Sequence, residues 1–125
     1  MKKSIENLAT SKITGGRSHP LRSRRKYEID RFSTETLTGE QITVTRKVRG
    51  KNLKTGIKTT NFVNLTVDSK IKRVKINREL ENATNKDYQR RGVISKGAIL
   101  ETGEGKCKVV SRPGQHGVVN AILIK

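Results

Sequence analysis

Apolar and polar residues alternate in several short stretches after residue 40. In QITVTRKVRG, Ile42, Val44 and Val48 share one parity, and mostly polar residues occupy the other. A period of two predicts a half-buried strand, because successive strand side chains point to opposite faces. Arg46 falls on the apolar parity, so we expect it either at the edge of a sheet or directed toward a ligand.

The next stretches predict a loop and two further strands. Residues 49–56, RGKNLKTG, are rich in Gly, Asn and Lys and predict a loop. NFVNLTVD (61–68) and KIKRVKIN (70–77) both show the period of two that is typical of strands. Asp68 and Ser69 lie between them as turn residues, so these two strands are expected to be consecutive.

Residues 78–92, RELENATNKDYQRRG, show no clear period. They form either a short helix after Asn77 or an irregular crossover, of which we favour the crossover. GVISKGAILET (92–102) predicts a strand. TGEG (102–105) predicts a turn, because its two glycines tolerate positive φ.

The end of the chain predicts two more strands. KCKVVS (106–111) again shows a period of two. RPGQHG (112–117) predicts a loop, in which Pro113 and Gly114 suit the central positions of a type II turn. VVNAILIK (118–125) is apolar on both parities, so this strand either pairs centrally or is covered on both sides.

Six or so short strands with Gly-rich turns predict a mainly β body, either a sandwich or a small barrel. We favour the barrel, because it removes sheet edges and because no helices are expected that could cover a sheet. Leu, Ile, Val and Phe number 31, and only five of them precede Phe32. The sequence therefore predicts an extended basic N-terminal arm over residues 1–31, flexible when free, and a barrel-like body over residues 32–125.

Charge indicates the kind of partner. The chain has 28 Lys or Arg against 11 Asp or Glu, a formal net charge of +17. Such a charge opposes compactness, so we expect a polyanion as the permanent partner. Nucleic acid fits best, because phosphates neutralise Lys and Arg and release counterions. A membrane surface usually binds an amphipathic helix with large apolar residues on one face, and we find none, so no membrane partner is expected.

The sequence offers no catalytic or metal-binding motif. GEGKC (103–107) fails the phosphate-binding loop pattern, because Leu100 and Cys107 stand where Gly and Ser or Thr are required. His19, Cys107 and His116 show no metal-ligand spacing. Cys107 falls on an apolar strand face and is expected to be a buried core residue. We therefore expect no enzyme activity, cofactor, metal or small-molecule substrate.

The basic residues gather in the arm, around the first loop, before a later strand and in the last loop. Arg makes forked contacts with phosphate and stacks on bases. Known sequence-reading modules are absent, so recognition of RNA shape and backbone is expected. The candidate RNA-binding residues are His19, Arg22, Arg24, Arg25, Lys26, Arg46, Lys47, Arg49, Lys51, Lys54, Arg90, Arg91, Lys96, Arg112 and His116.

Motifs from about residue 12 to the end resemble one known family. They are Gly15-Gly16-Arg17, Arg25-Lys26-Tyr27-Glu28, Arg31, Val48-Arg49-Gly50, Asn52, Ser95-Lys96-Gly97-Ala98-Ile99 and the segment VVSRPGQHGVVNAILIK. On these residues the chain is similar to small-subunit ribosomal protein eight of the archaeal/eukaryotic type, in its archaeal form. This family is distinct from the bacterial protein of the same ordinal.

The resemblance implies a structural constituent of the small ribosomal subunit that binds ribosomal RNA and neighbouring ribosomal proteins. It also implies a cytoplasmic location in the ribosome and no homo-oligomer. It adds Arg17, Tyr27, Arg31 and Asn52 to the RNA-binding candidates. Tyr27 either anchors packing or stacks on a base, and we favour packing.

Two positions depart from the family pattern. Lys51 stands where the family has a second Gly, which costs energy if this position requires positive φ. Asp30 stands where Gly is common, which predicts a stiffer junction between arm and body. Two alternatives stay open: a ribosome-assembly factor on the same domain, and a free RNA-binding module or small RNA-processing enzyme.

Overall fold

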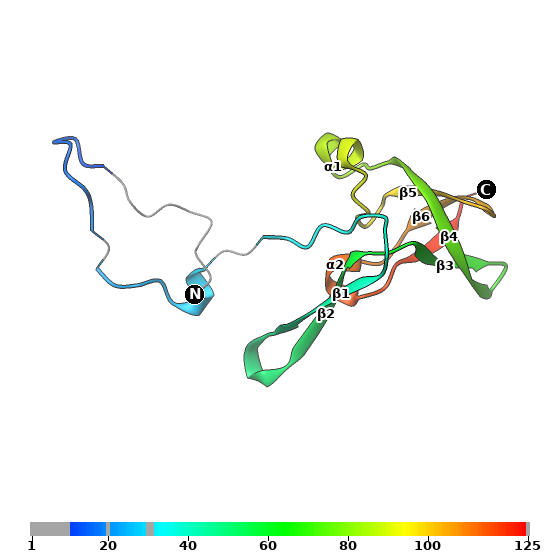
Figure 1. The fold of residues 1–125 in the computed structure, drawn as a ribbon, viewed down its shortest axis with the longest axis horizontal. Coiled ribbons are helices and arrows are strands. Elements are labelled where there is room, and N and C mark those ends of the chain that lie inside the picture. The colour runs from blue at the N-terminus through cyan, green and yellow to red at the C-terminus, as the bar shows by residue number, and fades with distance from the viewer. Residues whose placement is uncertain (1–10, 20, 30–31, 125) are drawn as a thin grey trace. The chain divides into compact units, whose positions relative to one another are not determined.

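The computed structural model describes residues 11–19, 21–29 and 32–124, and Figure 1 shows the chain as a ribbon. Its contacts divide the chain into two compact units, Met1–Ser33 and Thr34–Lys125. In the first unit, a turn brings Ser11 opposite Arg17, with Gly15 at a φ of +78°, and a single 3-10 turn, η1, covers Lys26–Glu28. The predicted Asp30 junction lies outside the described residues.

A closed five-stranded barrel forms most of the second unit. Each strand pairs antiparallel with the next in the chain, and the last returns parallel to the first. The mainly β, barrel-like fold expected from the sequence is thereby confirmed. The strands are β3 (Phe62–Val67), β4 (Lys70–Glu81), β5 (Ile99–Thr102), β6 (Gly105–Val109) and β7 (Asn120–Leu123).

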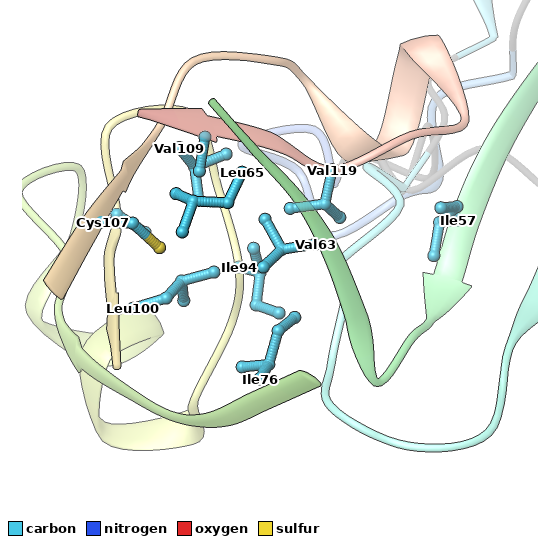
Figure 2. Packing of buried hydrophobic residues seen from close by; sticks show 11 residues of the cluster. Ile57, Val63, Leu65, Ile76, Ile94, Leu100, Cys107, Val109 and Val119 are labelled. Atoms are coloured by element: carbon cyan, nitrogen blue, oxygen red, sulfur yellow. The ribbon is translucent and has the colours of Figure 1, made fainter. Parts of the chain in front are cut away.

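The barrel interior is filled by the apolar parity of its strands, as Figure 2 shows. Val63 and Leu65 of β3 are fully buried, and so are Leu100 of β5 and Cys107 of β6. Ile94 enters the same cluster from the segment before β5. The expectation that Cys107 is a core residue is confirmed, and its burial raises the pKa of its thiol.

A separate two-stranded hairpin projects from the barrel (Figure 1). Strands β1 (Ile42–Lys47) and β2 (Leu53–Thr59) pair antiparallel, and the 3-10 turn η2 (Arg49–Lys51) joins them. The prediction of a loop over residues 49–56 was wrong in part, because the connection ends at Asn52 and β2 begins at Leu53. Only Gly56 and Ile57 of β2 are buried, so burial imposes no alternating apolar pattern on this strand.

The hairpin is connected to the barrel by the segment that precedes it. Leu37 N–H donates to the Lys58 carbonyl at 3.0 Å, and the Leu37 carbonyl accepts from Thr60 N–H at 3.0 Å. On the other side, the Thr36 carbonyl accepts from Ile94 N–H at 2.7 Å. The buried Thr36 hydroxyl donates to the Ile57 carbonyl at 2.7 Å. This segment therefore ties β2 to the barrel wall by main-chain bonds.

Residues 78–92 were expected to form a crossover rather than a helix, and this was wrong in part. Strand β4 continues to Glu81, and helix α1 covers Lys86–Arg91. Asn85 caps the helix by accepting from Asp87 N–H at 2.9 Å, and Gly92 ends it at a φ of +64°. Both are standard helix boundary residues. The strand predicted over 92–102 is shorter than expected and begins at Ile99.

The loop predicted over residues 112–117 contains a single helical turn, α2 (Pro113–His116). Pro113 occupies the first helical position, where its fixed φ and missing N–H do no harm. Gly117 ends the turn at a φ of +73°, and its N–H donates to the Pro113 carbonyl at 3.2 Å. The helical turn takes the place of the expected type II turn, because Gly114 is not at positive φ.

Candidate nucleic-acid interface

The β1–β2 hairpin carries positive charge without any acid to balance it. Between Gln41 and Val67 the chain has six Lys or Arg and no Asp or Glu. Strand register places Arg46 directly opposite Lys54. Like charges opposite one another destabilise an antiparallel pair. A bound polyanion would remove this repulsion. The six residues are Arg46, Lys47, Arg49, Lys51, Lys54 and Lys58.

The hairpin tip displays two of these cations. Arg49, Lys51 and Asn52 are exposed, and Val48 N–H closes the turn on the Asn52 carbonyl at 2.8 Å. Gly50 and Lys51 both have left-handed backbone conformations, at φ values of +68° and +62°. The departure at Lys51 therefore falls where positive φ is required, and a non-Gly residue there costs about 1 kcal/mol. Lys58 was missed as a candidate, because its strand was not predicted.

Arg46 is turned inward rather than toward solvent. Its side chain is half-buried, and Nη2 donates to the Gly114 carbonyl of α2 at 2.7 Å. The sequence placed Arg46 on the apolar parity of its strand, either at an edge or facing a ligand. The structure instead gives its guanidinium a main-chain partner within the protein.

Two glycines let α2 lie directly against β2, and a third lets it lie against Thr34. A Cβ added at Gly56 would meet the Gly114 carbonyl oxygen at 2.5 Å, and one added at Gly117 would meet Thr55 Oγ1 at 2.7 Å. On the opposite side of α2, a Cβ at Gly114 would meet the Thr34 carbonyl oxygen at 2.6 Å. Real side chains do not approach so closely. The segment RPGQHG therefore holds the base of the hairpin by close backbone packing.

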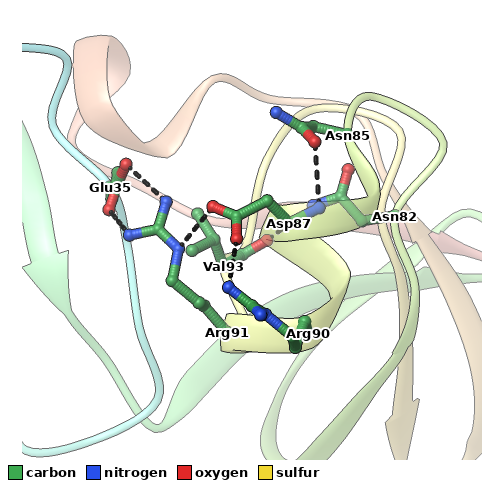
Figure 3. Close-up of polar contacts among 7 residues, drawn as sticks. All are labelled: Glu35, Asn82, Asn85, Asp87, Arg90, Arg91 and Val93. Atoms are coloured by element: carbon green, nitrogen blue, oxygen red, sulfur yellow. Dashed lines mark hydrogen bonds and ion pairs between the residues drawn. The ribbon is translucent and has the colours of Figure 1, made fainter.

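Helix α1 presents a second basic group, which Figure 3 shows from close by. Arg91 makes a bidentate contact with Glu35, at 2.7 and 2.8 Å, and its Nε lies 2.9 Å from Asp87. Arg90 also pairs with Asp87, at 2.8 Å, but its side chain is 80% exposed. The charge of Arg91 is thus balanced within the protein, whereas Arg90 and the exposed Lys96 remain accessible.

A buried amide fixes the segments on either side of α1. Asn82 Nδ2 donates to the Val93 carbonyl at 2.7 Å (Figure 3). Its Oδ1 accepts from Thr84 N–H at 3.1 Å and from the Ser95 hydroxyl at 3.0 Å. The Asn82 side chain is thereby satisfied at both ends, as a buried amide requires. It sets the position of α1 and of the Lys96 loop on the barrel.

The α2 turn positions two candidates. Arg112 and His116 are both exposed. Arg112 N–H donates to His116 Nδ1 at 3.1 Å, so one ring nitrogen of the histidine is used locally. This leaves Nε2 as the nitrogen available for an external partner.

Among the described residues of the arm, Arg22 and Glu28 form an ion pair. Arg22 holds Glu28 through two contacts of 2.8 and 2.6 Å, and Arg25 N–H donates to the same carboxylate at 2.9 Å. These contacts, led by the Arg22 hydrogen bond, lower the pKa of Glu28 to about 2. Arg24 Nη1 donates to the Glu28 carbonyl at 3.3 Å.

The other arm candidates differ in side-chain exposure, and one of them lies outside the described residues. Arg17 and His19 are exposed, and Tyr27 is 62% exposed. The packing role favoured for Tyr27 and its alternative, base stacking, both stay predictions. Lys26 lies in η1, and Arg31 falls outside the described residues.

Within the described ranges, no three His, Cys, Asp or Glu side chains gather closely enough to hold a metal ion. None of the helices described is long and apolar enough to cross a membrane. The GEGKC stretch forms the β5–β6 hairpin, in which Gly105 has a φ of +126°.

Comparison with known proteins identifies the family. The sequence profile described as Ribosomal protein S8e matches residues 6–124. The chain belongs to this family. The resemblance read from the sequence is therefore confirmed, and with it the expectation of a ribosomal, non-catalytic protein.

Curated archaeal relatives agree with the family profile over nearly their full length. The small ribosomal subunit protein eS8 of Methanocorpusculum labreanum is 43% identical over 122 residues, which are 96% of this chain and 98% of the relative. The protein of the same name from Sulfurisphaera tokodaii is 44% identical and covers 91% of each chain. That of Haloarcula marismortui is 41% identical, over 91% and 93% respectively.

Proposed function

We propose that this ribosomal protein is a structural constituent of the small subunit in the cytoplasm, and that it binds ribosomal RNA through phosphate and shape contacts. The observation that carries the proposal is the family match over residues 6–124, with relatives named as small-subunit proteins. The hairpin, with six cations and no acid, is the element best suited to the RNA backbone.

The candidate RNA-binding residues differ in whether carboxylates of the protein already neutralise their positive charge. Lys47, Arg49, Lys51 and Lys54 of the hairpin are exposed and make no ion pair with any described residue, so we assign them to phosphate. Arg91 positions α1 through its carboxylate partners. We keep the other candidates as RNA contacts: the arm residues, Asn52, Arg90, Lys96, Arg112 and His116.

The arm supports the same function. It combines exposed Arg17, Arg25 and Tyr27 with few apolar residues, a composition that orders when it binds a polyanion. We propose that residues 1–31 follow the RNA as a basic extension of the barrel body. Arg and exposed aromatic side chains supply the stacking and forked phosphate contacts that such an arm requires.

Binding of the full chain to naked small-subunit RNA at several salt concentrations tests the proposal. We compare a hairpin variant, with Lys47, Arg49, Lys51 and Lys54 changed to Gln, with a control that carries the same change at Lys70, Lys72, Lys75 and Lys86. The hairpin variant should reduce the slope of log affinity against log salt by about 3 to 4, because each lost phosphate contact contributes about 0.7 to 0.9. Equal slopes for the two variants would contradict the hairpin assignment.

Co-sedimentation separates this function from the alternatives. The full chain should sediment with mature small subunits at moderate salt. Presence in precursor particles and absence from mature subunits would instead indicate an assembly factor. Binding to naked RNA without entry into subunits would indicate a free RNA-binding module.

A further inference from the structure

Exposed apolar residues of the second unit concentrate on one side of the barrel. Among the described residues from Thr34 onward, nine large hydrophobic side chains are exposed, and five of them lie on the outside of β4, β6 and β7 or directly beyond these strands. We call these five the outer apolar face. They are Ile71, Val110, Val118, Ile122 and Ile124.

Strand register brings these residues together. Thr66 of β3 lies opposite both Ile71 of β4 and Ile122 of β7. Val110 N–H donates to the Asn120 carbonyl at 2.9 Å, which places Val110 beside the same strand. Ile71, Val110 and Ile122 therefore lie within or beside neighbouring strands, with the polar Thr66 between Ile71 and Ile122.

Residues 118–124 are mainly apolar on both parities, with Asn120 as the polar residue of the outer parity. Val119 and Ala121 are buried in the barrel, while Val118, Ile122 and Ile124 are between 41% and 49% exposed on the other parity. In an antiparallel strand with one buried face, the residues on the outer face are ordinarily polar. The sequence pattern favoured central pairing or cover on both sides. Pairing with β3 and β6 is observed, and no described element covers the outer side.

The chemistry of the face indicates a protein partner rather than RNA. Bases stack on aromatic rings and guanidinium planes, whereas these five side chains are aliphatic. The nearby ring of Phe62 is already covered by Arg73, whose Cζ lies 4.5 Å from the ring centroid. A concentration of exposed aliphatic side chains on one side of a protein is typical of protein interfaces.

Charge around the face limits the kind of partner. Lys108 lies opposite Ile122 across β6 and β7, and Ile124 N–H donates to the Lys106 carbonyl. Both lysines are exposed, and neither pairs with a carboxylate of the described residues. The barrel is closed, so β7 offers no free edge for an added strand. A partner must therefore pack on side chains and place acids opposite these lysines.

We propose that the outer apolar face docks another protein of the small ribosomal subunit, through a segment whose aliphatic or aromatic side chains are flanked by carboxylates. This inference rests on the proposed function, since the partner is a neighbour in the subunit. It assigns RNA to the hairpin and protein to the β7 side of the barrel.

Site-specific cross-linking in assembled subunits tests the docking. A photo-reactive amino acid replaces Ile122 in the full chain, small subunits are purified and irradiated, and the adducts are digested with nuclease and identified by mass spectrometry. We expect an adduct with a peptide of another ribosomal protein that has apolar residues flanked by Asp or Glu. An RNA adduct, an adduct with a second copy of this chain, or no adduct would overturn the docking and leave the proposed function intact. Absence of the chain from subunits would overturn both.

A second measurement tests whether the apolar side chains carry the contact. With the photo-reactive residue at Val110, the double variant Ile71→Thr and Ile122→Thr should lower the yield of the protein adduct about tenfold or more, because interface anchors typically cost a factor of this size. The matched control changes Leu37 and Ile42, which are also exposed, to Thr and should keep the yield. Equal yields in both variants would overturn the proposal.

Discussion

The close packing of α2 on β2 makes Gly56 the position where a single methyl group has the clearest consequence. In Gly56→Ala, the new Cβ would lie 2.5 Å from the Gly114 carbonyl oxygen and 3.0 Å from the Gly114 carbonyl carbon. Both are main-chain atoms, so no rotamer change relieves the contact. It would also lie 3.1 Å from Arg46 Nη2, whose hydrogen bond to Gly114 holds the hairpin base.

The expected cost follows from three contributions. Overpacking of a closely packed site costs about 1–3 kcal/mol. Weakening of the Arg46 hydrogen bond adds about 1 kcal/mol. The lower entropy of the unfolded chain, which Ala restricts more than Gly, returns about 0.4–1 kcal/mol. The net prediction is a loss of about 1–3.6 kcal/mol, concentrated in the hairpin.

Two measurements on the full chain check this prediction. Urea unfolding followed by far-ultraviolet circular dichroism gives the total loss, and hydrogen exchange of residues 42–59 locates it. Gly103→Ala is the matched control, because a Cβ at Gly103 meets nothing within 4 Å and its φ is not positive. The reasoning is refuted if the two variants unfold at the same urea concentration and protect residues 42–59 equally.

Three further predictions concern strain, ion pairing and pH. Lys51→Gly should slow hydrogen exchange at the hairpin tip relative to Lys51→Ala, because it relieves a backbone at φ +62°. A double-mutant cycle of Glu35→Ala and Arg91→Ala should give a coupling of about 0.5–1 kcal/mol that falls with added salt, since both side chains are partly exposed. The Glu28 carboxyl should titrate near pH 2 by NMR, so the stabilisation of η1 is complete above its ordinary pKa of 4.5 and disappears as the pH falls toward 2.

The sequence predicted those strands whose buried side chains impose an alternating apolar pattern. Strand β3 alternates because Val63 and Leu65 fill the barrel, and its period of two was readable for that reason. Strand β2 was missed because its contacts are made by main-chain atoms at Gly56, which leave no apolar pattern. At α2, Pro113-Gly114 favoured a type II turn locally, but Gly117 at the end of the segment stabilises a helical turn instead.

The candidate RNA-binding residues were likewise predicted only in part from the sequence. Clusters of cations are visible in the sequence in the arm and around the first predicted loop, but their place on a two-stranded hairpin was not predicted. Which cations the protein neutralises itself was not visible, because Arg91 and its partner Glu35 are 56 residues apart in the chain. Neighbouring residues give no signal for such a pair. The number of positive residues alone therefore overestimates how many are available to RNA.

The placement of the acids is more informative than the placement of the cations. Cations occur along almost the whole chain, but the carboxylates that form ion pairs among the described residues are Glu28, Glu35, Asp87, Glu101 and Glu104. All lie outside residues 41–67, so they neutralise cations in the arm, on the barrel and on α1, and none on the hairpin. A chain with a net charge of +17 gains stability wherever such pairs reduce self-repulsion. A hairpin without them keeps its repulsion until phosphates arrive, and its stability should therefore increase on RNA binding more than that of the barrel.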